Sequence, residues 1–112
     1  MALKYLKSLN TGNIAVGGSA TVTWTLDEDI HLKRMYLNDR NKTNLSSSQV
    51  WAEFGAGNVI TKDYAPCSIF GNSPLNALLI ERDFPKGSVF TLKITNGESS
   101  AINVDVVFEV GA

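Results

Sequence analysis

The sequence predicts an all-β protein, a single-domain antiparallel β-sandwich of about eight strands. Short segments in which apolar and polar residues alternate recur along the chain, and turn-forming residues separate them about every 8 to 12 residues. No stretch has the apolar spacing of a helix. The 112 residues are enough to enclose one hydrophobic core and too few for two. A jelly roll is the first choice of topology, and an immunoglobulin-like Greek key is the second.

The first 16 residues are the part of the chain that a closed sandwich explains least. They mix leucines and Tyr5 with lysines, a pattern that fits a first strand, a short helix or an arm that orders only against a neighbouring subunit, and we hypothesise the arm. We therefore divide the chain into residues 1–16 and a sandwich domain over residues 17–112. Tyr5 and Leu6 are the candidate contacts of such an arm. On the arm hypothesis, deletion of residues 1–12 abolishes assembly and leaves the folded core intact.

The sandwich domain begins with two alternating segments. In residues 20–26 the apolar side chains share one parity and three threonines share the other, which predicts a half-buried strand. Acidic residues 27–29 end it. Residues 30–37 form the next strand, but its apolar residues change parity halfway along, so a β-bulge near Lys33–Arg34 is expected.

The middle of the chain is less regular. Residues 38–49 are almost all polar or turn-forming and predict the longest loop, a kind of segment that is often functional. Residues 50–54 alternate and are expected to form a hairpin with a short strand at residues 59–60. Residues 64–70 contain Pro66, which favours an irregular strand at a sheet edge.

Three strands complete the predicted sandwich. Residues 76–84 contain the first, and residues 89–95 contain the second, with Phe90, Leu92 and Ile94 facing inward. Residues 102–110 alternate most regularly of all, with Ile102 and four later apolar residues on the inward side. These inward residues are aliphatic or aromatic, as expected where two sheets pack face to face.

Composition and charge exclude several classes of partner. Ten basic and eleven acidic side chains leave a net charge of -1, so no positive field attracts a nucleic acid. No run of 18 apolar residues and no apolar signal-peptide core occur, so neither a membrane span nor secretion is expected. Cys67 is the only cysteine, which rules out an intrachain disulfide and fits synthesis in a reducing host cytoplasm.

No catalytic, cofactor-binding or metal-binding constellation is predicted. His31 is the only histidine and has the outward parity of its strand, so we interpret it as a surface or interface residue. Cys67 follows a proline among apolar residues and resembles a small buried hydrophobe. The acidic residues 27–29 lack the spacing of a calcium-binding loop, and the glycines of residues 55–57 do not precede a helix.

Outward aromatic side chains are the remaining functional signal. Trp51 has the parity opposite to its apolar neighbours, and Tyr36 and Tyr64 are further candidates. They fit subunit contacts, a platform for stacking sugar rings if they share one face, or, for Trp51, packing beneath the loop of residues 38–49. The candidate interface residues are Tyr5, Leu6, Tyr36, Trp51 and Tyr64.

The closing strands give the chain a resemblance to a known class of protein. The segments "FPKGSVFTLKITN" (residues 84–96) and "AINVDVVFEV" (residues 101–110) resemble the last strands of single jelly-roll or sandwich proteins from the virions of bacterial and archaeal viruses. The resemblance implies a non-enzymatic capsid or capsid-decorating (cement) protein, often trimeric, located in the virion. Its partners would be copies of itself and a capsid shell protein. A carbohydrate-binding sandwich module is the alternative, and an enzyme that uses His31 is a third reading.

Overall fold

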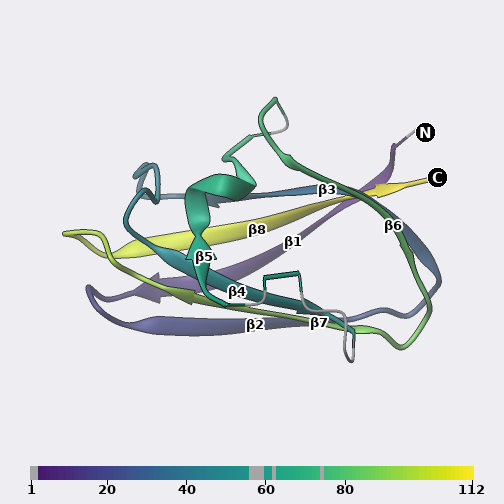
Figure 1. Cartoon of the computed structure of the whole chain (residues 1–112), viewed down its shortest axis with the longest axis horizontal. Helices are drawn as coiled ribbons and strands as arrows, with labels where there is room; N and C mark the ends of the chain where they lie inside the picture. The colour runs from purple at the N-terminus through teal and green to yellow at the C-terminus, as the bar shows by residue number, and fades with distance from the viewer. Residues whose placement is uncertain (1–2, 56–59, 62, 74) are drawn as a thin grey trace.

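The structure is a computed structural model that describes residues 3–55, 60–61, 63–73 and 75–112. Within these residues it has eight strands and one short 3₁₀ helix (Figure 1). In chain order the elements are β1 (Leu3–Ile14), β2 (Ser19–Thr25), β3 (Ile30–Asp39), β4 (Gln49–Phe54), β5 (Ala65–Pro66), η1 (Cys67–Phe70), β6 (Leu78–Phe84), β7 (Val89–Thr95) and β8 (Ile102–Gly111).

The strands form two four-stranded sheets with the strand orders β1-β8-β3-β6 and β2-β7-β4-β5. Antiparallel pairs join β1 to β8, β2 to β7, β3 to β6 and β4 to β5, as in one long hairpin folded over on itself. Two further antiparallel pairs, β3 with β8 and β4 with β7, complete the sheets. This is the strand order of a jelly roll, so the prediction of an all-β sandwich is confirmed.

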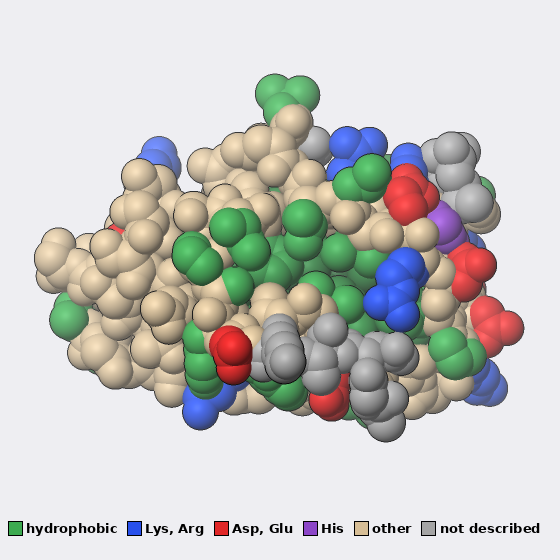
Figure 2. Space-filling view, in the orientation of Figure 1, with side chains coloured by type: hydrophobic (Ala, Val, Ile, Leu, Met, Phe, Trp, Pro, Cys, Tyr) green, Lys and Arg blue, Asp and Glu red, His purple; other side chains and the backbone are tan. Residues whose placement is uncertain are grey.

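The space between the sheets is filled by aromatic rings from both of them. Phe90 of β7 stacks on Phe54 of β4 at 4.4 Å between ring centroids and meets Trp24 of β2 edge-on at 5.3 Å. Phe108 of β8 and Phe84 of β6 contact this cluster from the other sheet, at 5.7 and 4.9 Å from Phe90. Loss of one such ring typically costs about 3–5 kcal/mol of folding free energy, so the cluster holds the two sheets together. In the space-filling view, hydrophobic side chains gather in the middle of the face on view (Figure 2).

The predicted bulge in β3 is present and explains the change of parity. Leu32 lies opposite Val110 of β8, and Arg34 lies opposite the very next residue, Glu109, so Lys33 is the extra residue. The bulge lets Leu32 and Met35 both enter the core, where neither has any exposed surface. A regular strand would have turned one half of β3 to the solvent.

Residues 1–16, for which the sequence left an arm and a strand open, contain the strand β1. It lies at the edge of its sheet and pairs with β8 of the same chain from Leu3 opposite Gly111 to Ile14 opposite Ile102. A register shift occurs between Asn10 and Asn13, where Gly12 has a positive φ of 72°. The picture of an arm that needs a neighbour in order to form is therefore replaced by a strand of this sheet.

The segment after β4 differs from its prediction. Val59 of the expected strand at residues 59–60 lies outside the described residues. Ile60 donates its backbone N–H to the carbonyl oxygen of Ala52 at 2.9 Å, but this return forms no strand. The irregular edge segment predicted around Pro66 is a two-residue edge strand followed by η1, a helix that the sequence did not reveal. The described residues therefore reach the count of eight strands with β1 included, and Ile60 belongs to none of them.

A buried carboxylate organises the long loop, which spans residues 40–48 in the structure. Asp39 is 3% exposed and ends β3. Its Oδ1 accepts the backbone N–H groups of Asn41 and Asn103 at 3.0 and 2.8 Å, and its Oδ2 accepts the N–H and hydroxyl of Thr43 at 3.1 and 2.7 Å. Burial opposes ionisation of Asp39, but these four hydrogen bonds outweigh it and lower the pKa of the carboxyl.

Candidate protein-interaction surface

A row of four side chains crosses the outer face of the β1-β8-β3-β6 sheet. Leu6 of β1 lies opposite Glu109 of β8, Glu109 lies opposite Arg34 of β3, and Arg34 lies opposite Leu79 of β6. We call these four residues the outer row. Residues directly opposite each other point to the same side of a sheet, so the outer row runs across all four strands. The two leucines at its ends are 54% and 64% exposed.

The centre of the outer row is a charged pair partly covered by its neighbours. The side chain of Glu109 is 11% exposed and that of Arg34 is 37% exposed. Arg34 Nε and Glu109 Oε2 are 3.4 Å apart, whereas a charge-assisted hydrogen bond is typically about 2.7–2.9 Å long. The pair therefore attracts electrostatically without a close hydrogen bond between these two atoms.

A second row lies beside the first. Val107 of β8 has Ser8 of β1 on one side and Tyr36 of β3 on the other. Val107 and Tyr36 are half-buried. Burial raises the pKa of the Tyr36 hydroxyl, and the negative charge of Glu109 adds to the effect. The hydroxyl therefore stays protonated at neutral pH, and this part of the face presents apolar and uncharged groups.

Polar networks bound the face at both ends of the strands. At one end Asp105 accepts hydrogen bonds from Arg40 Nε at 2.8 Å and Asn10 Nδ2 at 3.0 Å, and the first of these is the main reason why its pKa is lowered. At the other end His31 Nε2 lies 2.6 Å from Glu81 Oε2, and its Nδ1 lies 2.7 Å from Asp83 Oδ1. These polar rims lie at the two ends of a face whose middle combines apolar side chains with the Arg34–Glu109 pair.

The contacts of His31 favour its protonated form and do not suit it to activate a nucleophile. The hydrogen bond with Glu81, followed by the one with Asp83, raises the pKa of His31, because an imidazolium can donate to both carboxylates and a neutral ring to only one. The same bond with His31 lowers the pKa of Glu81. Both ring nitrogens are thus engaged by carboxylates, which leaves neither to act as a base toward a hydroxyl or thiol.

The five candidate interface residues from the sequence do not share one surface. Leu6 and Tyr36 lie on the outer face just described. Tyr5 points the other way and packs against the core. Trp51 lies on the outer face of the opposite sheet, beside Lys93 of β7, and Tyr64 is 43% exposed just before β5. The idea of a single aromatic platform built from Tyr36 and Trp51 is therefore wrong, because the two rings lie on opposite sides of the sandwich.

Three residues of the outer row were not among the interface residues predicted from the sequence, although the local pattern of two of them could have indicated an outward position. Leu79 stands between Leu78 and Ile80, and in a strand one member of three successive apolar residues must face outward. Glu109 interrupts a strongly apolar strand at the outward parity. Nothing local to Arg34 could have shown it beside Glu109, because that contact depends on the register between strands 75 residues apart in the chain.

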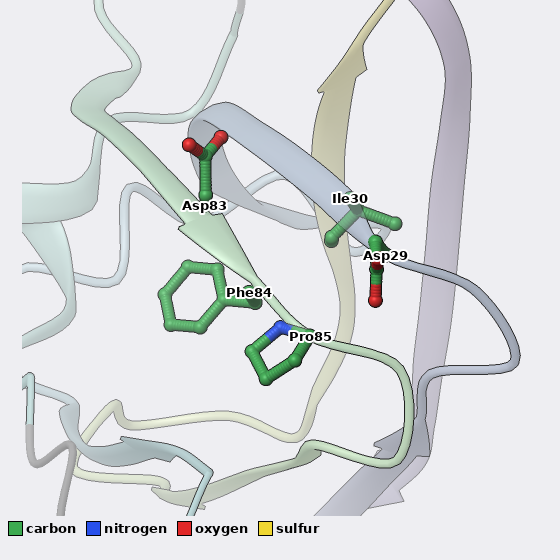
Figure 3. A pocket seen from close by; sticks show the side chains of 5 residues that line it. All are labelled: Asp29, Ile30, Asp83, Phe84 and Pro85. Carbon is green, nitrogen blue, oxygen red and sulfur yellow. The ribbon is translucent and has the colours of Figure 1, made fainter.

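A hollow of about 450 Å³ lies at the edge between the two sheets, where β6 ends and β3 begins (Figure 3). It is lined by Asp29, Ile30, Asp83, Phe84 and Pro85. Both carboxylates already have partners, since Asp83 bonds to His31 and Asp29 Oδ1 accepts the backbone N–H of Lys86 at 2.7 Å. The hollow therefore offers a small apolar surface with carboxylates that are already engaged.

Cys67 also lies in an environment typical of a residue that packs in the core. It is 1% exposed, and burial raises the pKa of its thiol to about 12, so the thiolate needed for nucleophilic attack does not form near neutral pH. In the described part of the chain, no three His, Cys, Asp or Glu side chains are grouped so as to hold a metal ion. Nor is any helix of that part long and apolar enough to cross a membrane.

Comparison with known proteins finds no family model and no curated protein that matches this chain. The arrangement of its surface therefore carries the functional argument. Of the surfaces described, the outer face of the β1-β8-β3-β6 sheet combines exposed leucines, a partly covered charged pair and polar rims, which are features of protein interfaces.

Proposed function

We propose that this protein is a non-enzymatic structural subunit of a virion, which decorates or cements a capsid shell through protein–protein contacts. The observation that carries the proposal is the outer row, with Leu6 and Leu79 exposed on either side of Arg34 and Glu109. A subunit contact would cover both leucines together with the charged pair between them, and this supports the proposal.

The topology supports the same proposal by analogy of fold. Jelly rolls with two sheets of four strands are found in viral capsid proteins, and also in lectins and cupins. A fold does not by itself define a function, so the analogy selects among roles that the surface already allows. The partners proposed are further copies of this chain, with a trimer as the order suggested by the resemblance, and a capsid shell protein.

Sedimentation of particles from the source culture tests the virion proposal. An antibody against the chain should detect it in a dense, nuclease-resistant fraction, and the variant Leu6→Asp should be lost from that fraction while remaining folded. The matched control is Leu75→Asp, because Leu75 is 99% exposed in the loop before β6 and lies outside the outer row. A chain that stays with free proteins at the top of the gradient contradicts the proposal.

A carbohydrate-binding module is the second candidate, and Trp51 is the observation that favours it. Trp51 lies outward on β4 beside Lys93 of β7, which in turn lies beside Thr21 of β2. An aromatic ring followed across the sheet by an ammonium group and a hydroxyl offers a stacking surface and hydrogen-bonding groups for a sugar ring. A glycan array probed with the wild-type protein and with Trp51→Ala tests this candidate, with Tyr36→Ala on the opposite sheet as the control.

A further inference from the structure

We propose that the outer face of the β1-β8-β3-β6 sheet binds the same face of a second copy of this chain, forming a two-fold dimer. The inference rests on the proposed function, names a copy of this chain as the first partner of the surface, and replaces the trimer suggested by the resemblance with a dimer. Along the outer row, the order of charged and apolar side chains makes the row complementary to a copy of itself that is rotated by a two-fold axis.

Across the sheet the outer row reads Leu6, Glu109, Arg34 and Leu79. Consider a second copy placed face to face and related by a two-fold axis that runs along the strands, between β8 and β3. Strand β1 then faces β6 of the partner, and β8 faces β3 of the partner. Glu109 meets the partner's Arg34, and Leu6 meets the partner's Leu79, with the reciprocal contacts formed at the same time.

The neighbouring row obeys the same symmetry. Val107 of β8 faces the partner's Tyr36, and Tyr36 faces the partner's Val107. The dimer therefore covers these half-buried side chains in both chains. At the His31 end of the sheet, Lys4 of β1 faces the end of the partner's β6, which carries the carboxylates of Glu81 and Asp83. Lys4 is already paired with Glu28 of its own chain and the two carboxylates with His31, so the charges in the centre, and not those at the rim, define the proposed contact. A rotation about an axis across the strands would instead place Glu109 against the partner's Glu109, so the charges select one orientation.

A partner chain should stabilise the Arg34–Glu109 pair more than it would stabilise a fully exposed ion pair. Within one chain the side chain of Glu109 is only 11% exposed. Most of the free-energy cost of removing this carboxylate from water is therefore incurred before a partner binds. Arg34 Nε and Glu109 Oε2 are 3.4 Å apart, which is longer than a typical charge-assisted hydrogen bond. A second guanidinium above this carboxylate, in a site closed to water, provides an attraction that is less screened than at a free surface.

The size of the face sets the expected strength. Four strands spaced about 4.8 Å apart, each contributing about seven residues at about 3.4 Å, give a face of roughly 19 by 24 Å. Two such faces bury roughly 900 Å² in total, which is at the low end for specific complexes. We therefore expect a dimer that dissociates as the protein is diluted through the micromolar range.

Charge reversal provides the decisive test. In Glu109→Arg two arginines of one chain face two arginines of the other, and in Arg34→Glu four glutamates meet, so each variant alone should remain at the monomer mass of 12.1 kDa in light scattering. A 1:1 mixture of the two variants restores opposite charges at both contacts and should give twice that mass. Since each variant loses its in-chain pair in the mixture too, an effect on folding alone would not be reversed by mixing.

Two sets of controls complete the test. The double variant Arg34→Glu with Glu109→Arg keeps both the in-chain and the inter-chain pairing and should dimerise like the wild type. Leu6→Asp should raise the dissociation constant by about a hundredfold, and Leu75→Asp should leave it unchanged. If a charge-reversed chain fails to fold by circular dichroism, Leu6→Asp and Leu79→Asp carry the test, because both positions are largely exposed.

Three results would overturn the inference. They are a wild-type protein that stays monomeric at about 1 mM, a dimer that survives both single charge reversals, and a stable trimer in place of the dimer. None of these outcomes removes the chain from particles in the sedimentation experiment. Conversely, a dimer that obeys the mixing rule but never sediments with particles supports the contact and contradicts the virion proposal.

Discussion

His31 Nδ1 lies 2.7 Å from Asp83 Oδ1, so the only imidazole of the chain ties the start of β3 to the edge strand β6. The contact with Glu81 on the same strand doubles this link. Glu81 has a positive φ of 50°, which is uncommon for a residue other than glycine, and its bond to His31 helps to hold this conformation. The edge of the sheet therefore depends on the protonation of one side chain.

Stability should fall as the pH rises through the pKa of His31. The pKa is raised in the folded protein above its ordinary value of 6.5, so the contribution is fully present below pH 6.5 and is lost as the pH passes the higher folded pKa. Thermal unfolding of the wild type between pH 6 and pH 9 should show this loss. In His31→Gln the slope over that range should be absent, and an unchanged slope would contradict the role given to His31.

Replacing the buried Asp39 should destabilise the fold more than replacing its exposed neighbour Asn38 with alanine. In Asp39→Asn an amide replaces an oxygen that accepts N–H or O–H groups, so we expect the free energy of unfolding to fall by about 2–4 kcal/mol in urea titrations. Asn38→Ala is the matched control and should change it by less than about 0.5 kcal/mol. Because the pKa of Asp39 is lowered, its contribution is lost only as the pH falls through that lowered value.

Gly97 should not tolerate a side chain. A Cβ atom there would lie 2.0 Å from the carbonyl oxygen of Ser47, so Gly97→Ala must push the loop of residues 40–48 away from the start of the β7–β8 connection. The displacement breaks the hydrogen bond from Gly97 N–H to Ser48 Oγ, which is 3.2 Å long. We expect a loss of about 2 kcal/mol or more in urea titrations. Ser99→Ala, at an exposed position of the same connection, should be neutral.

Cys67 should be silent toward thiol reagents until the protein unfolds. Its burial and a pKa of about 12 leave almost no thiolate at pH 8. Titration with a chromogenic disulfide reagent should detect no fast-reacting thiol in the native protein and one per chain in guanidinium chloride. Rapid labelling of the native protein would show that the segment around Cys67 opens readily.

Deletion of residues 1–12 should abolish the fold and not only the assembly. The deletion removes nearly all of β1, and β8 would then present its unpaired N–H and C=O groups along a new sheet edge. We expect loss of the cooperative thermal transition and aggregation. A truncated chain that keeps its melting transition would restore the arm hypothesis. Lys4→Ala, which changes an exposed residue of β1 and keeps the strand, is the control for the fold.

Much of the sandwich could be predicted because its signals are local. The alternation in β7 and β8 reports directly which side chains face the core, and the change of parity in residues 30–37 required the bulge at Lys33. The short helix η1 had no such signal, since its four residues lie within a segment that Pro66 already made irregular. Strand β1 was ambiguous because its lysines fit an edge strand as well as a free arm.

The sequence by itself determined the all-β class, the inward residues of most strands and the outward position of Tyr36, because strand periodicity has a range of only a few residues. Only the tertiary structure decided which outward residues share a face. Pairing β1, β8, β3 and β6 in that order brought Leu6, Glu109, Arg34 and Leu79 into one row and placed Trp51 on the other side of the sandwich. The reason is physical: the order of strands in a sheet is set by the packing of the whole core, to which every segment contributes and which none specifies alone.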